Sequence, residues 1–365
     1  MESVKVLEII GKRPVGGVGT VILNYQKNID REKVQMDYLI FGEQEELFDQ
    51  DVKKLGSKVY LYPALSGRKM GQTKKHFEEF FAEHGNEYDV VHLHAPNIAF
   101  LCFPIAKKYG INHRIVHSHA TLYAENKIKA IRNKLLWSMA KDSITDRIAC
   151  SLAAGEFLFE KEEFVLMKNA IPYENYLYNP QLREQVRQKE GVEDKLVIGN
   201  VGRFSQQKNQ TFLIDIFEKV VEKNPQSVLW LVGDGELRSE LECKVKDKGL
   251  TDAVKFWGMV DNARELYQAM DVMVMPSLFE GLPMVGVEAQ ASGLPCVYSD
   301  TITKEIDVVG CPYISLDVDC DIWADTVIME AARENRRSYG EELDRMGFNI
   351  RLEAKRLEEL YLAMK

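Results

Sequence analysis

Short apolar runs alternate along the chain with longer stretches whose apolar residues recur at helical spacing. This alternation is typical of repeated β–α units built around a parallel sheet. In the first half, the apolar runs predict strands at Val4–Ile10, Val34–Phe41, Val59–Tyr62, Val90–Leu93, Arg114–His117 and Arg147–Ala149. The segments between them predict helices at Val18–Ile29, Thr73–Glu83, Ile98–Tyr109 and Asn126–Lys141.

The same rhythm restarts after a turn-rich stretch, Asn169 to Pro180, which we interpret as the connection between two domains. The predicted strands of the second half are Leu196–Val201, Ser227–Val232, Val254–Trp257, Val272–Met275 and Cys296–Ser299. The predicted helices are Gln210–Lys223, Glu236–Lys248, Ala263–Met270, Met284–Ser292 and a closing amphipathic segment, Asn349–Met364. The fold class is therefore α/β with two Rossmann-like, doubly wound domains, over residues 1–175 and 190–345. Ligands of such sheets bind outside the carboxyl ends of the strands, so we expect the active site in a cleft between the two domains.

Composition narrows this expectation. The 365 residues exceed the size at which one hydrophobic core stops growing. The formal net charge of −9 argues against a nucleic-acid partner. The six scattered cysteines and the lack of a leader sequence favour a reducing cytoplasm. The most apolar stretch, residues 97–106, is about half the length of a membrane span.

The strongest local pattern follows the predicted strand that ends at Met275. The sequence continues PSLFEGLPMVGVEA, with Pro283 expected at the first position of a helix. The amides of Met284 and Val285 then lie at the positive end of the helix dipole, where a phosphate binds well. Glu280 precedes this helix and Glu288 lies on it, where a carboxylate suits the hydroxyls of a ribose. The alternative is a helix-capping Glu280 and a solvent-facing Glu288.

Two further loops follow predicted strands. Gly202 is followed by Arg203 and Lys208, the two kinds of cation that neutralise a diphosphate, although an exposed basic loop is the alternative. Gly16 and Gly17 follow the first strand and suit a close phosphate approach, although a plain turn explains them equally well. The loop is not G-x-G-x-x-G and no acidic residue ends the second strand, which disfavours NAD.

Four of the seven histidines, His92, His94, His117 and His119, fall at strand ends in the first half. We expect the members of each pair to lie on opposite faces of their strand and therefore not to chelate a metal together. The preferred interpretation is one histidine that donates a hydrogen bond to a sugar.

With these residues in view, the chain resembles glycosyltransferase family 4 enzymes of the GT-B fold. The resemblance rests on the E-x7-E motif of Glu280 and Glu288 and on the G-R-x-x-x-x-K element that ends at Lys208. The variant EAQASGLPC, followed by Ser299-Asp300, is similar to bacterial exopolysaccharide and capsule transferases.

The resemblance implies a role for each matched residue. Arg203 and Lys208 would hold the donor diphosphate, Glu288 the ribose and Glu280 the transferred sugar. The other implied contacts are the Met284 and Val285 amides and the Gly16-Gly17 turn at the phosphates, backbone near Val260 at the base, and His119 (or its neighbour His117) at the sugar.

The family resemblance also implies a reaction. It is a retaining, metal-independent transfer, without a cofactor, from a nucleotide sugar, by default a UDP-sugar, to a glycan or polyprenyl-linked acceptor. The closing helix, about residues 349–365, would pack back on the first domain. The alternatives are a nucleotide-sugar epimerase of similar fold and a non-catalytic nucleotide-sugar-binding subunit.

One predicted helix suggests a second partner. The segment 126–141 combines five cations with Ile128, Ile131, Leu135, Leu136 and Trp137. A basic amphipathic helix of this kind can rest on anionic lipid, at the inner face of the plasma membrane. An ordinary surface helix with Leu and Trp in the core is the equal alternative.

Overall fold

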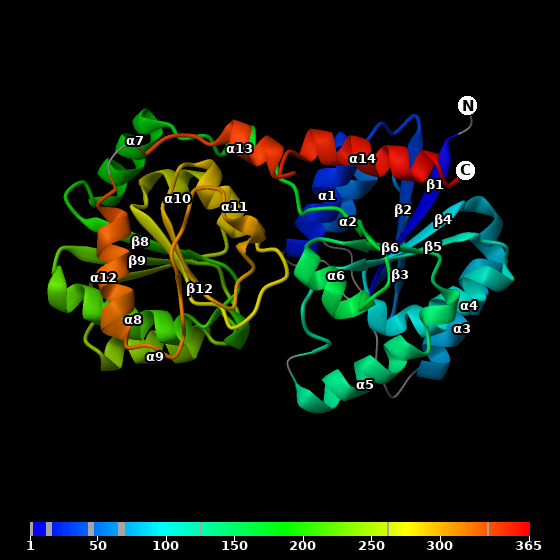
Figure 1. The fold of residues 1–365 in the computed structure, drawn as a ribbon, viewed down its shortest axis with the longest axis horizontal. Helices are drawn as coiled ribbons and strands as arrows, with labels where there is room; N and C mark the ends of the chain where they lie inside the picture. Colours follow the sequence, from blue (N-terminus) through cyan, green and yellow to red (C-terminus); the bar gives the residue numbers. More distant parts are fainter. Residues whose placement is uncertain are drawn as a thin grey trace. The chain divides into compact units, whose positions relative to one another are not determined.

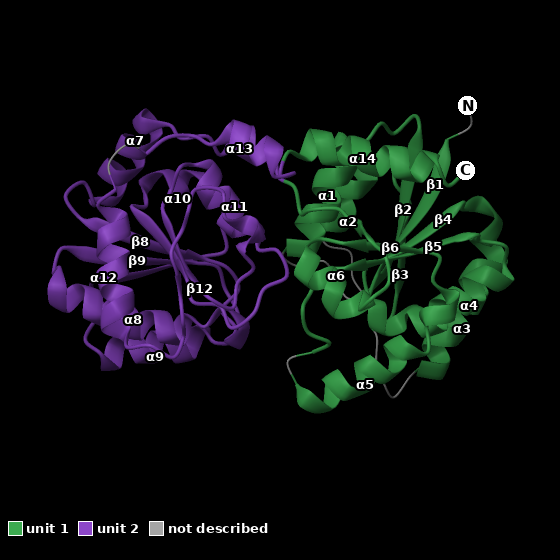
Figure 2. Ribbon diagram, viewed as in Figure 1, with its two compact units in different colours: residues 1–170, 349–365 green, residues 171–348 purple. Residues whose placement is uncertain are grey.

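The structure is a computed structural model that describes residues 3–11, 17–42, 47–64, 70–124, 126–260, 263–333 and 336–365. The chain forms two compact units (Figure 2). Unit 1 comprises Met1–Ala170 and Asn349–Lys365, and unit 2 comprises Ile171–Phe348. Each unit contains one sheet of parallel strands covered by helices (Figure 1).

The sheet of unit 1 has the strand order β3-β2-β1-β4-β5-β6-β7. Its strands are β1 Val4–Ile10, β2 Val34–Phe41, β3 Val59–Tyr62, β4 Val90–Leu93, β5 His113–Ser118, β6 Asp146–Ala149 and β7 Val165–Leu166. Its helices are α1 Gly17–Asn28, α2 Leu47–Lys54, α3 Met70–His84, α4 Ala99–Lys108, α5 Lys127–Ser138, α6 Leu152–Phe159 and α14 Ile350–Leu362. The central strands are buried on both faces, which explains why they read as continuous apolar runs.

The sheet of unit 2 has the order β10-β9-β8-β11-β12-β13. Its strands are β8 Leu196–Val201, β9 Ser227–Val232, β10 Val254–Gly258, β11 Val272–Met275, β12 Cys296–Ser299 and β13 Tyr313–Ile314. Its helices are α7 Pro180–Glu190, α8 Gln210–Lys223, α9 Arg238–Asp247, α10 Ala263–Ala269, α11 Met284–Ala291, α12 Cys320–Ala331 and α13 Gly340–Arg345. In both sheets the chain starts in the middle, builds three strands to one side and then continues on the other.

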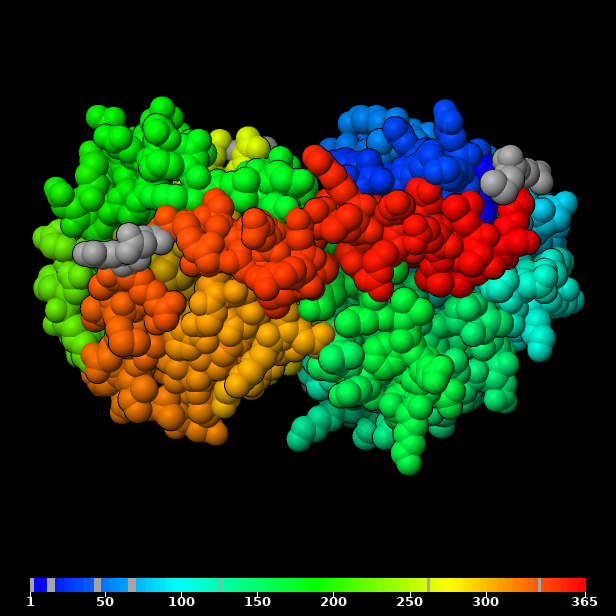
Figure 3. Space-filling view, turned by 45° about the horizontal axis from the view of Figure 1, so that its top comes forward, coloured from blue at the N-terminus to red at the C-terminus, as the bar shows by residue number. Residues whose placement is uncertain are grey.

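The last helix, α14, belongs to unit 1 although the chain reaches it from unit 2. It packs against α1, and Figure 3 shows this C-terminal segment in red beside N-terminal residues in blue. The Glu358 carboxylate on α14 accepts hydrogen bonds from the Asp30 amide at 3.0 Å and from Lys33 Nζ at 3.1 Å. Tyr361, one turn further on, is fully buried. The helix therefore contributes side chains to the interior of unit 1.

Several elements differ from the sequence-based expectation. Five helices (α2, α6, α7, α12 and α13) and two short strands (β7 and β13) were not predicted. The break between the units lies at residues 170 and 171, so most of the expected connecting stretch belongs to unit 2. Four of the six free cysteines are buried, whereas Cys243 is exposed and Cys320 is half-buried.

Candidate active site residues

Each sheet has one topological switch point, where two neighbouring strands lead to helices on opposite faces. In unit 2 it lies between β8 and β11, which pair directly. The segments that follow these two strands, residues 202–209 and 276–283, carry the predicted diphosphate and sugar residues. A crevice at such a point is the usual ligand site of an open α/β sheet.

Lys208 and Glu280 meet at this point. Lys208 Nζ lies 2.6 Å from Glu280 Oε1, and the two side chains are 16% and 7% exposed. The neighbouring Gln207 amide donates to the Phe279 carbonyl at 3.1 Å and to the second Glu280 oxygen at 3.3 Å. Asn209 donates to the Pro276 carbonyl at 3.1 Å. The two predicted segments are therefore joined to each other, and the prediction that they lie together is confirmed.

Arg203 behaves differently. Its guanidinium is 65% exposed and pairs with Glu236, with Nη2 at 2.9 Å from the carboxylate. Gly202, just before it, lies against Lys208, because a Cβ at Gly202 would come within 3.2 Å of Lys208 Cε. The loop thus holds Lys208 inward and leaves Arg203 at the surface.

Helix α11 begins at Met284, the start of its predicted range. Pro283 is its N-cap and Met284 its first residue, so the prediction of Pro283 at the first helical position is wrong. Proline has no side-chain hydrogen-bond acceptor, so no side-chain hydrogen bond from its N-cap residue caps the start of α11. The Met284 and Val285 amides are the first two of α11, where an α-helix has no intrahelical acceptor. Two hydrogen bonds hold the preceding loop in place. The hydroxyls of Ser299 and Thr301 both donate to the Ser277 carbonyl at 2.6 Å.

Glu288 lies on the fifth residue of α11 and is buried, so the solvent-facing alternative is wrong. Its two oxygens accept hydrogen bonds from Tyr176 at 3.2 Å and from Tyr267 at 2.9 Å. Burial raises the pKa of Glu288 above its ordinary value, although the two tyrosine hydrogen bonds lower it in part. Neither tyrosine was predicted as a site residue. Tyr176 lies in the segment that we interpreted only as a connection.

The remaining residues predicted to bind the nucleotide-sugar donor are Val260, Gly16 and Gly17. Val260 follows β10, an edge strand of the sheet in unit 2. Gly17 is the first residue of α1, and a Cβ there would meet nothing within 4 Å. Gly16 lies outside the described residues.

The histidines form a hydrogen-bonded cluster at the switch point of unit 1, between β1 and β4. His94 Nε2 lies 2.7 Å from Glu8 Oε2, and His94 Nδ1 lies 2.8 Å from His119 Nε2. Glu8 is on β1, in register with His92 on β4.

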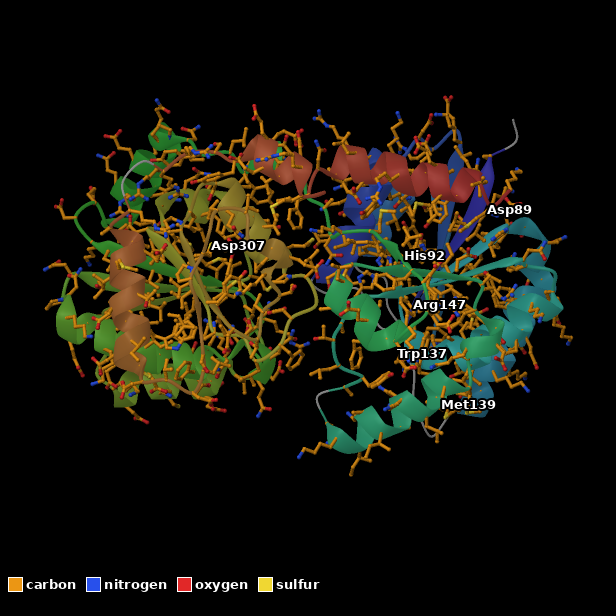
Figure 4. The ribbon with its side chains drawn as sticks, viewed as in Figure 1. Asp89, His92, Trp137, Met139, Arg147 and Asp307 are labelled. Carbon is orange, nitrogen blue, oxygen red and sulfur yellow. The ribbon has the colours of Figure 1, made fainter. Side chains whose placement is uncertain are left out.

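A second branch starts from the other oxygen of Glu8. Tyr361 donates to Glu8 Oε1 at 3.0 Å and lies 2.6 Å from His92 Nδ1. His92 Nε2 in turn lies 3.2 Å from His117 Nδ1. His92 lies in the interior of unit 1 (Figure 4).

The expectation that each histidine pair would be split across its strand is wrong. Residues one apart alternate between faces, whereas residues two apart share a face. The rings of His92 and His94 stack with centroids 4.5 Å apart, and those of His117 and His119 with centroids 4.0 Å apart. Sequence reasoning also missed Glu8, although a carboxylate inside an apolar strand is a signal that could have indicated it.

Burial controls the charges of this cluster. It lowers the pKa of His92 to about 4, against the opposing effect of Glu8. It also lowers the pKa values of His117 and His119 well below the ordinary range. Burial alone would raise the pKa of Glu8, but His92 and the hydrogen bonds from His94 and Tyr361 bring it below its ordinary value. Glu8 is therefore ionised at neutral pH, and His92, His117 and His119 are neutral.

A metal ion could in principle be held here. His92, His94 and His117 offer ligand atoms that all lie within 4.8 Å of one another. Five of their six ring nitrogens, however, already form hydrogen bonds to Tyr361, Glu8, His119 or each other. The sixth is His117 Nε2. A metal would have to break these contacts, so the geometry favours a hydrogen-bonded network.

Part of unit 2 matches the model of a known protein family. The family model described as "Glycosyl transferases group 1" matches residues 195–327, which span β8 to most of α12. The chain is 31% identical over 369 residues to the putative glycosyltransferase EpsF of Bacillus subtilis (strain 168), covering 98% of this chain and 96% of that protein. The chain belongs to the group 1 glycosyltransferases.

Two further similarities extend over the whole of this glycosyltransferase. It is 23% identical to the capsular polysaccharide biosynthesis glycosyltransferase CapH of Staphylococcus aureus, covering 99% of each chain. The structure of Anabaena Alr3699/HepE in complex with UDP and glucose matches it with a TM-score of 0.80, at 18% identity, covering 99% of this chain and 100% of that one. The fold is GT-B, as expected from the sequence.

Among the helices that the structure describes, none is long and apolar enough to cross a membrane.

Proposed function

We propose that this glycosyltransferase is a family 4 enzyme that transfers a sugar, with retention of its anomeric configuration and without a metal ion, from a UDP-sugar to a glycan or polyprenyl-linked acceptor. The observation that carries the proposal is the largely buried Lys208–Glu280 pair at the unit 2 switch point, next to the first amides of α11. A cation and an uncapped helix start together supply the positive charge that a diphosphate needs.

In this mechanism the bond between the sugar C1 and the diphosphate oxygen breaks, and a bond from C1 to the acceptor oxygen forms on the same face. The proton of the acceptor hydroxyl goes to the departing diphosphate, so no side chain acts as a covalent nucleophile. Lys208 and Arg203 stabilise the negative charge that develops on the leaving group. Arg203 is suited to this because its exposed guanidinium can exchange Glu236 for a phosphate.

The carboxylates of Glu288 and Glu280 bind opposite ends of the nucleotide-sugar donor. Glu288 binds the ribose hydroxyls, held in place by Tyr176 and Tyr267. Glu280 contacts the transferred sugar once Lys208 turns to the diphosphate. Its own carboxylate then has hydrogen-bonding capacity for sugar hydroxyls.

The choice of donor and pathway is supported by the relatives. HepE is crystallised with UDP and glucose, and CapH is named for capsular polysaccharide biosynthesis. We therefore propose a UDP-sugar donor and a role in exopolysaccharide or capsule biosynthesis.

A peripheral site at the inner face of the plasma membrane is supported by α5. Its apolar residues at helical spacing are exposed: Ile128 by 80%, Ile131 by 73%, Leu135 by 63% and Met139, its C-cap, by 60%. Lys127 and Lys134 flank this row on one side and Lys129 and Arg132 on the other. Trp137, by contrast, is buried and donates to the Leu158 carbonyl at 3.0 Å, so it anchors the helix (Figure 4). An apolar row between cations fits the boundary of an anionic membrane.

The test combines binding and product analysis. Thermal-shift measurements with UDP, GDP, ADP and NAD, each with and without EDTA, should show a metal-insensitive rise in melting temperature with UDP. Incubation with the matching UDP-sugar and an acceptor should give a product whose anomeric proton has the donor configuration by NMR. Inversion of the anomer, dependence on a divalent metal, or conversion of the donor without an acceptor would each refute the proposal, the last in favour of an epimerase.

A further inference from the structure

The hydrogen bonds between the histidines of unit 1 each have a donor and an acceptor, and Glu8 determines which is which. An ionised carboxylate only accepts hydrogen bonds. Both Glu8 oxygens are engaged, one by Tyr361 and one by His94. Each of these neighbours must therefore donate its hydrogen toward Glu8.

The first branch runs from Glu8 to His119. When His94 carries a single ring hydrogen and donates it from Nε2 to Glu8, its Nδ1 carries none. The contact of 2.8 Å between His94 Nδ1 and His119 Nε2 is then a hydrogen bond donated by His119. His119 Nδ1 is left as a bare acceptor.

The second branch runs from Glu8 to His117. Tyr361 has one hydroxyl hydrogen and gives it to Glu8, so at 2.6 Å its oxygen must accept from His92 Nδ1. His92 Nε2 is then bare and accepts from His117 Nδ1 across 3.2 Å. His117 Nε2 is left as a bare acceptor, like the nitrogen at the end of the first branch.

These two terminal nitrogens, His117 Nε2 and His119 Nδ1, are also the ring nitrogens of the cluster that are buried without a hydrogen-bond partner in the part of the chain that the structure describes. A buried polar atom without a partner is costly and is often explained by a ligand. His117, with Glu8, His92 and His94, lines a small cavity of about 20 Å³. That volume is enough for one water molecule, which could donate to His117.

We propose that Glu8 is a positioning residue that fixes the tautomers of all four histidines, so that His119 presents a hydrogen-bond acceptor to a sugar hydroxyl. The proposal rests on the proposed function for the identity of the ligand. It reverses the polarity that we expected from the sequence, in which the histidine donates. It also gives α14 a role in the site, because Tyr361 closes the second branch.

The tautomers can be measured without any substrate, by long-range ¹H–¹⁵N NMR of the ¹⁵N-histidine protein at pH 7.5. The expected wild-type result is a hydrogen on Nε2 of His94 and His119 and on Nδ1 of His92 and His117. A hydrogen on His119 Nδ1, or a doubly protonated His94, would overturn the proposal. Ring signals that change when EDTA is added would also overturn it, because a metal would occupy the lone pairs.

Glu8→Gln is the variant that tests the cause. A glutamine amide accepts on one side and donates on the other, so one branch must invert while the other keeps its tautomers. Glu353→Gln is the matched control, because Glu353 is also a buried glutamate of unit 1 but pairs with Arg356 at 2.7 Å. It should leave all four tautomers unchanged. If both branches keep their tautomers in Glu8→Gln, Glu8 does not set them.

Tyr361→Phe provides a second route should Glu8→Gln fail to fold. It removes the hydroxyl that accepts from His92 Nδ1, so the tautomers of His92 and His117 should become mixed while those of His94 and His119 stay fixed. A transfer assay adds the functional readout, with an expected loss in kcat/KM of about tenfold in variants whose His119 tautomer inverts. The two proposals fail separately: an enzyme without transferase activity but with these tautomers refutes only the function, and an active enzyme with other tautomers refutes only the role of Glu8.

Discussion

Lys208 Nζ and Glu280 Oε1 lie 2.6 Å apart at the end of two adjacent parallel strands, although 72 residues separate them in the chain. The pair is largely buried, which makes each charge dependent on the other. It also means that the cation proposed for the diphosphate is already ordered before the donor arrives. Pre-positioned charge of this kind needs little rearrangement during the reaction.

Replacing Lys208 should separate catalysis from stability. We expect Lys208→Met to reduce transfer by roughly a hundredfold. It should also lower the free energy of unfolding by about 3 kcal/mol, because the buried Glu280 carboxylate loses its cationic partner. The double variant Lys208→Met/Glu280→Gln should recover most of the stability but not the activity.

The control for this experiment is Lys244→Met, which breaks a pair of equal length in the same unit, Lys244 to Asp215 at 2.6 Å. Both partners there are more exposed, so the loss should stay below about 1 kcal/mol and transfer should be unchanged. Recovery of transfer in the double variant would contradict the role given to Lys208.

The raised pKa of Glu288 should be visible in the pH dependence of the protein's stability. Its raised pKa means that the folded state binds a proton more readily than the unfolded state, so its contribution is full below the ordinary value of 4.5 and is lost as the pH rises through the folded value. Glu288→Gln should therefore raise the melting temperature of unit 2 at pH 8 and lose this advantage toward pH 4.5, by calorimetry. The same variant should weaken UDP binding by about tenfold. A lower melting temperature at pH 8 would show that the charge stabilises the fold.

The strands of both sheets could be predicted closely because they are buried. β1, β2, β8 and β9 have the predicted bounds, since a strand covered on both faces consists mostly of apolar residues. α6 was missed because it is apolar nearly all round and shows no helical periodicity. α7 was missed for the opposite reason, being mostly polar, although Asn179 as N-cap and Gly191 in the left-handed conformation after its last turn are signals that mark its ends.

The candidate site divides in the same way. Residues that follow a strand, such as Lys208 and Glu280, could be placed from the sequence because topology brings strand ends together. The partners that orient them could not, since Tyr361 reaches Glu8 across 353 residues and no local pattern encodes that contact. The prediction for the histidines was wrong for a narrower reason, because it assigned residues two apart to opposite faces of a strand.

Unit 1 should be more sensitive to acid than its composition suggests. His92 has a folded pKa of about 4 against an ordinary value of 6.5, so below pH 6.5 the unfolded chain takes up protons that the folded chain does not. The contribution of His92 to the free energy of unfolding is complete above pH 6.5. It is lost as the pH falls, by about 1.4 kcal/mol per pH unit. Burial of His117 and His119 acts in the same direction. Guanidinium unfolding at pH 7.5 and 5.5 should show this loss.

Two variants assign the acid loss. His117→Gln should make it smaller, because one buried imidazole is gone. His113→Gln should leave it as it is, because the His113 side chain is 33% exposed. An equal pH dependence in both variants would place the acid sensitivity outside the histidine cluster.

The exposed row on α5 predicts binding to anionic vesicles. Ile128→Ser/Ile131→Ser removes two exposed side chains without touching buried Trp137, so the fold should be unchanged. We expect sedimentation with phosphatidylglycerol vesicles to fall at least tenfold at low salt, because two buried apolar side chains are lost from the lipid contact. Ile322→Ser/Met329→Ser is the matched control, since these α12 residues of unit 2 are 52% and 61% exposed. Binding that is lost equally in both variants, or that persists in neutral vesicles at high salt, would contradict a specific role of α5, because its cations should make the interaction depend on lipid charge and ionic strength.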